Sequence, residues 1–433
     1  MDLDPALQAL FDRVTFDHIS DVGVERFRAL YLERAALTPS PVVIADVSDR
    51  TICGGLGARI YRPDPGATGA AVVVLFHGGG WTIGNLDTHD HLAREVARQT
   101  DAVVVSVDYR LAPEHPYPAA VEDAWSALQW VAEHAAELGG DPARLAVAGD
   151  SAGGNLAAVV AQMARDHGGP ALRFQLLWYP ATSLDPDLPS MTDNAEAPIL
   201  NRADMLLFQH CYTGDSDPSS FPAGVVPARG DLTGLPPAYI ATAGFDPLRD
   251  DGALYAELLH AGGSDVELRL HDGLTHGFIG YAQWVPSAAA ALARSLSALE
   301  IGLARAGDAG SPRPPDAVPP PLDDDEDVFD AEIVETTTPG SSPAISIGSS
   351  PAVSPAPDYS AAGVPSLDYV RDRIEGRLAT ATGSAELAEA AAAREAASKA
   401  AAEHRAVITA DQQREAREQA ARDRLAEIRR SLE

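Results

Sequence analysis

The chain has 433 residues and carries 63 Asp and Glu against 32 Lys and Arg, a formal net charge of −31 with a pI near 4.6. So acidic a surface disfavours nucleic acid and anionic membranes, and we expect neither as a partner. The two cysteines, Cys53 and Cys211, match no disulfide framework or metal-ligand spacing, so no metal site is expected.

The N-terminus lacks the basic and apolar pattern of a signal peptide, and no apolar stretch is long enough to span a bilayer. We therefore expect a soluble, cytosolic protein. Hydrophobic residues make up 45% of the chain, which is enough for a sizeable core. α/β folds hold about 250 to 300 residues in one domain, so the remainder of the chain needs another explanation.

Two amphipathic helical patterns open the chain between residues 5 and 35. Their apolar positions are Leu7, Leu10, Phe11 and Val14, then Val24, Phe27, Leu30 and Tyr31. Strand-like segments follow at 42–47 and 58–61. Helices that precede the first strand are equally consistent with a lid over a site and with simple packing.

A continuous apolar run at 71–76 is typical of a strand buried on both faces. It ends in His77-Gly78-Gly79-Gly80-Trp81, where three glycines let the backbone approach a ligand closely. Taken alone, this segment would be interpreted as a plain glycine turn.

The pattern then predicts a helix at 87–99, a strand at 102–107, a Pro-rich rigid loop at 108–118 and an amphipathic helix at 119–138. His115 lies in the loop. Its place in a Pro-rich segment favours a structural role over that of a catalytic base.

The sharp turn Gly149-Asp150-Ser151-Ala152-Gly153 is flanked by a short apolar strand, 144–148, and a small-residue helix that begins near Asn155. Strand, Gly-x-Ser-x-Gly turn and helix together indicate a nucleophile elbow, which exposes the Ser151 hydroxyl. A serine nucleophile needs a base beside it and an acid to orient that base. It also needs oxyanion donors, for which the N–H groups of Gly79, Gly80 and Ala152 are the candidates.

A strand is predicted at 172–179, followed by a polar, Pro-broken insertion at 181–220 with one helical patch near 202–212. The insertion is a candidate second part of a lid. In that case the apolar residues of its helix would face the site; the alternative is that they belong to the ordinary core. These residues are Met205, Leu206 and Phe208.

Asp246 follows a predicted strand at 238–243, where a catalytic acid belongs. Three other carboxylates compete with it, and we interpret them as helix-start or surface charges: Asp250, Asp251 and Asp265. A helix at 248–260 and an edge-like strand at 266–270 come next.

His276 lies in a Gly-flanked loop after that last strand, so it can reach Ser151. His271, at the strand end, is interpreted as structural. A helix at 286–306 closes the domain. The chain order Ser151, Asp246, His276 is the order used by the α/β-hydrolase fold.

These segments resemble the hormone-sensitive-lipase family of α/β-hydrolase esterases. The matching motifs are His77-Gly78-Gly79-Gly80, Asp108-Tyr109-Arg110-Leu111-Ala112-Pro113-Glu114, Gly149-Asp150-Ser151-Ala152-Gly153-Gly154, Asp246-Pro247-Leu248 and His276-Gly277-Phe278. The resemblance implies an α/β fold with a mostly parallel sheet, a helical cap, no cofactor, and hydrolysis of short- to medium-chain acyl esters. It also implies the catalytic roles of Ser151, Asp246 and His276. The cap segments, about 1–40 and 181–220, fit the family's cap by position only.

The α/β-hydrolase domain is expected to occupy residues 1–307. Residues 308–365 are rich in Pro, Ser, Gly and acidic residues, which predicts a disordered linker. Residues 366–433 are rich in Ala, Glu and Arg, which predicts a helical tail. Its large apolar residues are sparse, which favours a solvated helix over one that binds a protein partner or self-associates.

Three functional hypotheses follow. The first is a serine carboxylesterase, and the second is an amidase or peptidase of the same fold, since the triad does not select the leaving group. The third is a ligand-binding receptor on a hydrolase scaffold, as in the gibberellin receptors that resemble this family. A receptor is expected to lack a triad member, whereas all three stand in matching motifs here.

Overall fold

The computed structural model describes residues 2–14, 16–37 and 40–304. The linker and the helical tail expected at 308–365 and 366–433 lie outside the described residues, so their predicted structure is not addressed below.

An eight-stranded sheet forms the centre of the described domain, in the order β1-β2-β4-β3-β5-β6-β7-β8. β1 and β2 pair antiparallel, β2 also runs antiparallel to β4, and the other pairs are parallel. The strands are β1 (Asp46–Thr51), β2 (Gly57–Arg62), β3 (Ala70–Phe76), β4 (Val103–Asp108), β5 (Gly140–Asp150), β6 (Leu172–Trp178), β7 (Ala238–Phe245) and β8 (Val266–Thr275).

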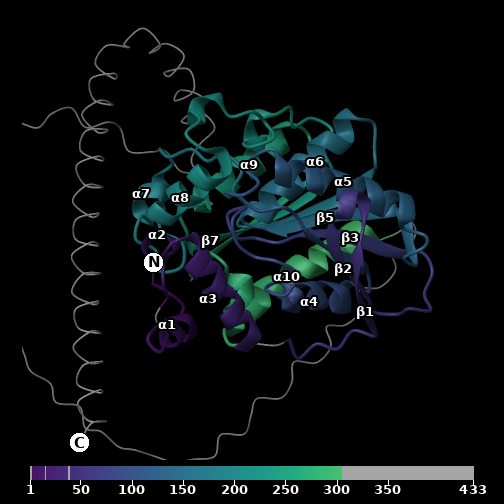
Figure 1. The fold of residues 1–433 in the computed structure, drawn as a ribbon, viewed down its shortest axis with the longest axis horizontal. Coiled ribbons are helices and arrows are strands. Elements are labelled where there is room, and N and C mark those ends of the chain that lie inside the picture. Colours follow the sequence, from purple (N-terminus) through teal and green to yellow (C-terminus); the bar gives the residue numbers. More distant parts are fainter. Residues whose placement is uncertain (1, 15, 38–39, 305–433) are drawn as a thin grey trace, which may run out of the picture. The chain divides into compact units, whose positions relative to one another are not determined.

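Helices cover both faces of the sheet (Figure 1). α4 (Asp90–Thr100) and α10 (Pro286–Leu303) lie on one face, and α5 (Ala119–His134), α6 (Ala152–Asp166) and α9 (Arg249–Ala261) lie on the other. Successive side chains of a strand point to opposite faces. Accordingly, Val73 of β3 packs in the core with α4 and α10, whereas Val72 and Val74 pack in the core with α5, α6 and α9. This double burial explains the unbroken apolar run at 71–76.

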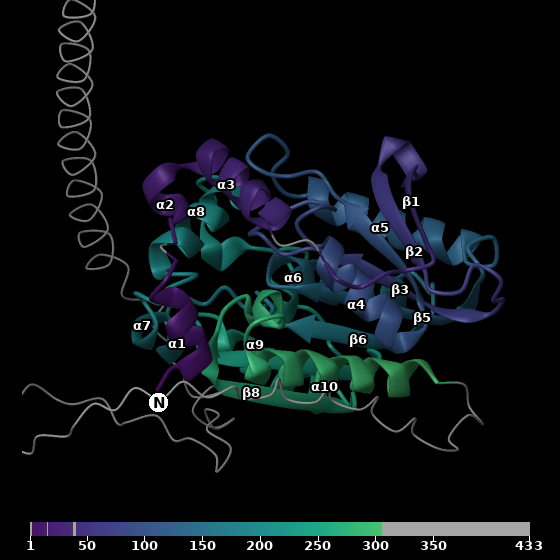
Figure 2. The ribbon, with the colours of Figure 1, turned by 90° about the horizontal axis from the view of Figure 1, so that it is seen from below.

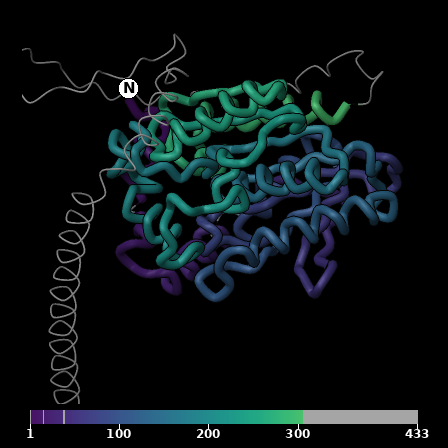
Figure 3. The backbone as a smooth tube through the Cα atoms, turned by 90° about the horizontal axis from the view of Figure 1, so that it is seen from above, coloured from purple at the N-terminus to yellow at the C-terminus, as the bar shows by residue number. Residues whose placement is uncertain are grey.

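The remaining α-helices gather at one end of the sheet (Figures 2 and 3). They are α1 (Pro5–Phe11), α2 (Ile19–Val22), α3 (Val24–Leu37), α7 (Pro189–Asp193) and α8 (Arg202–Thr213). α2 contacts α8, so the two cap segments meet although they are far apart in the sequence. Short 3-10 turns complete the domain at η1 (Cys53–Gly55), η2 (Pro218–Ser220), η3 (Pro227–Arg229) and η4 (Phe278–Tyr281).

The caps of these helices follow local chemistry. Asp4 accepts hydrogen bonds from Ala6 N and Leu7 N ahead of Pro5, which starts α1. Asn201 and Asp204 form a reciprocal capping box that starts α8.

The predicted strand at 42–47 is wrong in its position. Val43 is 87% exposed, and β1 begins only at Asp46 and continues through polar residues. β1 is the edge strand, where pairing to β2 supplies the backbone hydrogen bonds and no apolar face has to be buried. The apolar residues at 42–44 therefore led to a predicted strand that begins too early in the sequence.

The bounds of α4 and α5 also differ from prediction. α4 begins at Asp90 instead of residue 87, because the Asn85 side chain accepts hydrogen bonds from Asp87 N and Thr88 N and holds a turn there. α5 ends at His134 instead of residue 138. Within the described ranges, none of the helices is long and apolar enough to cross a membrane.

Candidate active site

Ser151 sits between β5 and α6 with φ +54° and ψ −117°, a backbone conformation that L-residues rarely adopt. A Cβ at Gly149 would collide with the backbone of Gly153, and one at Gly153 would collide with the backbone of Phe76. Ser151 N also donates to Trp178 O (2.9 Å). The elbow is therefore held by close backbone packing that glycine alone permits.

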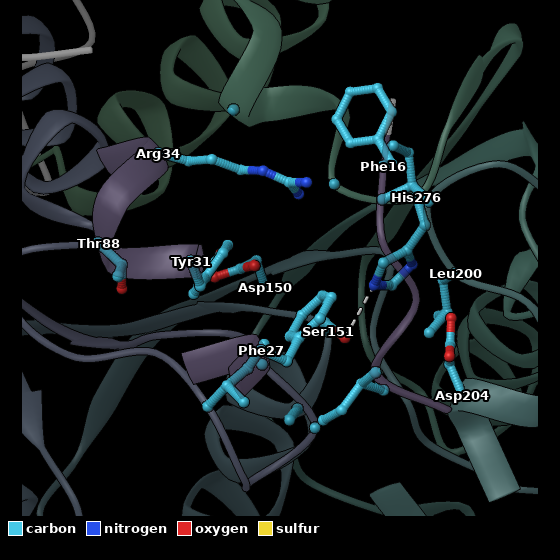
Figure 4. Close-up of a pocket in the computed structure, with 18 of the residues that line it drawn as sticks. Phe16, Phe27, Tyr31, Arg34, Thr88, Asp150, Ser151, Leu200, Asp204 and His276 are labelled. Carbon is cyan, nitrogen blue, oxygen red and sulfur yellow. Dashed lines mark hydrogen bonds between the residues drawn. The ribbon is translucent and has the colours of Figure 1, made fainter. Parts of the chain in front are cut away.

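The structure brings the three predicted triad residues together (Figure 4). His276 Nε2 lies 2.9 Å from Ser151 Oγ, and His276 Nδ1 lies 2.8 Å from Asp246 Oδ2. Asp246 follows β7 and is fully buried, and His276 follows β8. A carboxylate only accepts, so Nδ1 carries the proton and Nε2 presents its lone pair to the serine hydroxyl.

The loop that carries Asp246 is held from two sides. Leu248 N donates to Asp246 Oδ1 (2.8 Å), which fixes the carboxylate. Asn194, in the 181–220 segment, donates through Nδ2 to Gly244 O (3.1 Å) and Asp246 O (3.0 Å). The second cap segment thus positions the acid of the triad.

The competing histidines lie elsewhere. His115 is exposed on its loop. His271 lies in β8 with its ring 5.1 Å from that of Phe278, and burial lowers its pKa. Neither residue lines the cavity at Ser151.

The competing carboxylates lie away from the triad, at the start of a helix or on the surface. Asp265 is exposed, as predicted. Asp250 and Asp251 lie in the first turn of α9, which confirms the helix-start interpretation for both, and they are only 3% and 2% exposed. The Asp251 carboxylate accepts hydrogen bonds from the N–H and hydroxyl groups of Thr182 and Ser183 and from Leu184 N, at 2.5–3.0 Å. It anchors the start of the second cap segment.

We expect Asp251→Asn to lower the free energy of unfolding by about 3 kcal/mol, because the amide cannot accept all five hydrogen bonds and leaves buried donors unsatisfied. Urea unfolding of the full chain measures the change. Asp265→Asn removes one exposed carboxylate and serves as the matched control, with a change within about 0.5 kcal/mol. Equal unfolding free energies for the two variants would contradict the anchoring role.

The glycine loop after β3 has its carbonyl groups bonded to the protein. Tyr109 Oη donates to His77 O (2.7 Å), Thr82 N and Ile83 N donate to Gly79 O, and Thr82 Oγ1 donates to Gly80 O (2.8 Å). The carbonyl oxygens of His77, Gly79 and Gly80 therefore already have donors within the protein.

The N–H groups of Gly79, Gly80 and Ala152 donate to no acceptor among the residues that the structure describes, and all three residues line the cavity at Ser151. Backbone donors without another acceptor beside a nucleophile are what an oxyanion hole requires. The structure therefore places the three predicted donor residues beside the serine.

His77 supports this loop from within the core. Its Nδ1–H donates to Gly78 O (2.8 Å), and its ring stacks on Tyr109 at 4.2 Å. Burial, together with the charge of nearby His89, lowers the pKa of His77 to about 3, so the ring is neutral. The 108–118 loop was predicted only to be rigid; its contribution of Tyr109 to the glycine loop was missed.

Arg28 of α3 ties the first cap segment to the same region. Its guanidinium donates to Thr82 O (2.8 Å) and Ala112 O (2.7 Å) and forms a bidentate pair with Glu114 at 2.7 and 2.8 Å. These hydrogen bonds lower the pKa of Glu114 to about 2. No local pattern marks Arg28, because its partners are 54 to 86 residues away in the sequence.

A cavity of about 500 Å³ opens above Ser151 and His276. Both cap segments supply apolar side chains to its wall. These include Leu10, Phe16, Ile19, Phe27 and Tyr31 from the first segment, and Ile199, Leu200, Met205 and Phe208 from the second. Met205 and Phe208 thus face the site, whereas Leu206 is 52% exposed.

Asp204 joins the two cap segments at the cavity (Figure 4). Its buried carboxylate accepts hydrogen bonds from Ser20 N (3.1 Å) and Ser20 Oγ (2.7 Å), and it lies 2.6 Å from His18 Nδ1. These partners lie 184 and 186 residues away in the chain. Asp204 therefore links the two cap segments directly where they form the cavity wall.

Among the residues that the structure describes, no group of three or more His, Cys, Asp or Glu side chains is placed to hold a metal ion. Cys53 and Cys211 are both free thiols.

Comparison with known proteins shows which family the chain is similar to. The model of the α/β-hydrolase-fold family matches residues 73–280. Carboxylesterase NlhH of Mycobacterium tuberculosis is 51% identical over 311 residues, which cover 70% of this chain and 97% of the relative. Esterase LipI of the same organism is 51% identical over 306 residues, covering 70% of this chain and 95% of the relative.

Solved structures agree. The hyperthermophilic esterase from Pyrobaculum calidifontis is 38% identical with a TM-score of 0.65, and the match covers 70% of this chain and 100% of that one. Carboxylesterase EstE1, from a metagenomic library, is 40% identical with a TM-score of 0.62, covering 65% of this chain and 98% of that one. The fold is thus that of the α/β-hydrolases. Within that class, the chain belongs to the hormone-sensitive-lipase family of carboxylesterases.

Proposed function

We propose that this protein is a serine carboxylesterase that hydrolyses short- to medium-chain acyl esters, with Ser151 as nucleophile, His276 as base and Asp246 as orienting acid. The observation that carries the proposal is the continuous hydrogen-bonded line Asp246–His276–Ser151 at the floor of an apolar cavity. Relatives named carboxylesterase and esterase support the same reaction class.

In the acylation step, Ser151 Oγ attacks the ester carbonyl carbon while His276 Nε2 takes its proton. Asp246 holds the proton on Nδ1 and stabilises the imidazolium that forms. The proton on Nε2 then passes to the leaving alkoxide, which departs as the alcohol and leaves Ser151 acylated. Water, deprotonated by His276, hydrolyses the acyl-enzyme and releases the acid.

The tetrahedral intermediate places a negative charge on the former carbonyl oxygen. The N–H groups of Gly79, Gly80 and Ala152 are the proposed donors to that oxygen, since they have no other acceptor among the described residues. One such donor is typically worth about 3 kcal/mol of transition-state stabilisation. Because the carbonyls of the loop are already bonded, these donors need no reorganisation when the charge develops.

The proposed chain length rests on the cavity. A volume of about 500 Å³ with apolar walls suits a small ester and lies within the usual range of small-molecule sites, about 300 to 1,000 Å³. The cap segments form much of the wall, so their side chains are expected to set the preferred length.

We expect Met205→Ala to lengthen the preferred substrate, because it removes side-chain volume from the cavity wall. The ratio of kcat/KM for long over short chains should rise about fivefold, equivalent to about 1 kcal/mol. A p-nitrophenyl acyl series and an alkyl acetate series measure this ratio. The series that responds shows whether Met205 contacts the acyl or the alcohol part.

Leu206→Ala is the matched control, because it removes a similar volume from the neighbouring residue, which is half exposed and does not line the cavity. Its ratio should equal that of the wild type in both series. The same shift in both variants would show that altered helix stability, and not the cavity wall, sets the chain length.

The amidase and receptor hypotheses become outcomes of the same substrate series. Hydrolysis of anilides at rates comparable with those of esters would favour an amidase. Tight binding of an ester that is not converted would favour a receptor. The cytosolic location stays a prediction from the sequence, as does the preference for a solvated helix over a partner-binding one at 366–433.

A further inference from the structure

The glycine loop packs against α8 of the second cap segment. A Cβ at Gly80 would lie 2.2 Å from Cγ of Phe208, so the Gly80 backbone rests directly on the Phe208 ring. The next residue, Trp81, stacks on Tyr212 with ring centroids 4.3 Å apart and an interplanar angle of 3°. Phe208 and Tyr212 are four residues apart on a helix, so one face of α8 meets two consecutive residues of the loop.

The backbone of this loop adopts a conformation that its own residues do not select. Gly79, Gly80 and Trp81 have φ values of +121°, +57° and +55° in succession. Glycine adopts such values freely but many others as well, so neither glycine by itself fixes the direction of its N–H group. Positive φ is unfavourable for a bulky residue such as Trp81, so contacts outside the loop must hold it there.

The hydrogen bonds within the loop fix its internal shape only. Thr82 donates through its N–H to Gly79 O and through Oγ1 to Gly80 O, so both bonds link one part of the loop to another. The start of the loop is tied to the nucleophile elbow, where Gly78 N donates to Asp150 Oδ1 (2.8 Å). The far end of the loop needs a restraint of its own.

At that far end, α8 restrains the rotation that sets the direction of the loop. Trp81 O accepts from Ala112 N (2.8 Å), but a carbonyl bond does not fix φ, which is the rotation between Trp81 and the preceding peptide. Phe208 holds Gly80 on one side of this rotation, and Tyr212 holds the Trp81 ring on the other. Together the two contacts oppose relaxation of Trp81 to negative φ.

α8 is itself held at both ends, so it can act as a rigid support. In its first turn, Asp204 accepts hydrogen bonds from Ser20 of the first cap segment. In its last turn, Tyr117 N donates to Tyr212 O (2.8 Å), and the Tyr117 ring packs edge-on against that of Tyr212 at 5.9 Å. Tyr212 is fully buried and does not line the cavity at Ser151. Its position therefore serves the loop and not the substrate.

We propose that α8 clamps the glycine loop, with Tyr212 as a positioning residue. The Trp81–Tyr212 stack and the Phe208–Gly80 contact keep the loop at positive φ, and they thereby hold the N–H groups of Gly79 and Gly80 toward Ser151. The proposed function uses these N–H groups only as donors; the clamp makes the second cap segment part of what aligns them. The cap then controls the rate of the chemical step as well as the shape of the cavity.

Variants of Tyr212 test the clamp kinetically, and this arm rests on the proposed esterase function. Tyr212→Leu keeps apolar volume but removes the stacked ring, so kcat on a short-chain ester should fall about 10-fold or more, with KM within about twofold. Tyr212→Phe keeps the ring and removes only Oη, which is buried without a hydrogen-bond partner among the described residues. This conservative variant should recover kcat to within about twofold of the wild type. Wild-type kcat in Tyr212→Leu, or an equal loss in both variants, would overturn the proposal.

Inhibitor binding separates positioning of the donors from a general disturbance of the cavity. A trifluoromethyl ketone adds to the serine hydroxyl and carries a negative oxygen in the tetrahedral adduct, whereas the alcohol product carries none. In Tyr212→Leu the inhibition constant of the ketone should rise about 10-fold, and that of the alcohol should stay within about twofold. Equal changes for both inhibitors would show that the cavity, and not the donor alignment, depends on Tyr212.

Amide hydrogen exchange of the full chain tests the clamp without any activity. Thr82 N and Ile83 N donate to Gly79 O, so their exchange reports how often the loop opens. Tyr212→Leu should speed exchange in the segment 77–84 about 10-fold, while Tyr212→Phe should leave it unchanged. If Tyr212→Leu does not fold, Trp81→Leu breaks the same stack from the loop side and should give the same faster exchange. Unchanged exchange in the folded variant would overturn the clamp even if the protein hydrolyses no ester.

Discussion

Ser151→Ala abolishes ester hydrolysis: we expect kcat to fall by at least about 10⁴-fold, because no other hydroxyl occupies the position 2.9 Å from His276 Nε2. The substitution removes one oxygen and leaves the elbow backbone intact, so the unfolding free energy should change by no more than about 1 kcal/mol. Hydrolysis of a p-nitrophenyl acyl series by the purified full chain, with the variant alongside, measures both the reaction and its chain-length preference.

Ser297→Ala is the matched control, since Ser297 is exposed on α10 away from the cavity. It should retain wild-type kcat/KM. Turnover by Ser151→Ala within tenfold of the wild type would contradict the assignment of the nucleophile and point to hydrolysis elsewhere on the surface.

Asp246→Asn should lower kcat by about 10⁴-fold with little change in KM. The carboxamide Oδ1 still accepts from Leu248 N, so the loop keeps its shape. Its NH₂ group, however, donates to His276 Nδ1 and drives the ring proton to Nε2. The nitrogen that faces Ser151 Oγ then carries a proton and cannot act as a base. Steady-state kinetics on one short-chain ester separates kcat from KM.

Asp265→Asn tests whether this loss is specific to the triad. In the sequence, Asp265 was an alternative to Asp246 for the role of catalytic acid. It is exposed and directly precedes β8, which is an edge strand of the sheet. We expect its variant to keep wild-type kcat. A comparable loss in both variants would mean that general acidity of the surface, and not the His276 contact, controls the rate.

How far the site could be predicted depends on the range of the forces that shape it. Ser151 was predictable because its strained turn requires glycine at positions 149 and 153. Both positions lie within five residues of sequence, so a local motif reveals them. Asp246 and His276 were predictable because parallel strands end at the same edge of a sheet, where residues of separate loops meet.

The supporting contacts were not predictable in the same way. Asp204 and Ser20 are 184 residues apart, and Asp251 is 67 to 69 residues from the backbone it anchors. Asp251 was interpreted as a helix-start or surface charge because its own neighbourhood contains only the first turn of α9. Its burial depends on where the second cap segment returns to the sheet, and no local periodicity encodes that return.

The amino-acid sequence by itself determined the α/β class, most of the sheet strands, the elbow and the order of the three triad residues, because each follows from backbone sterics or hydrophobic periodicity over a few residues. Only the tertiary structure decided the edge strand at Asp46–Thr51, the cavity wall built by both cap segments, and the packing of α8 on the glycine loop. These features depend on segments that meet after folding, where burial and hydrogen-bond satisfaction act on residues that the sequence keeps far apart.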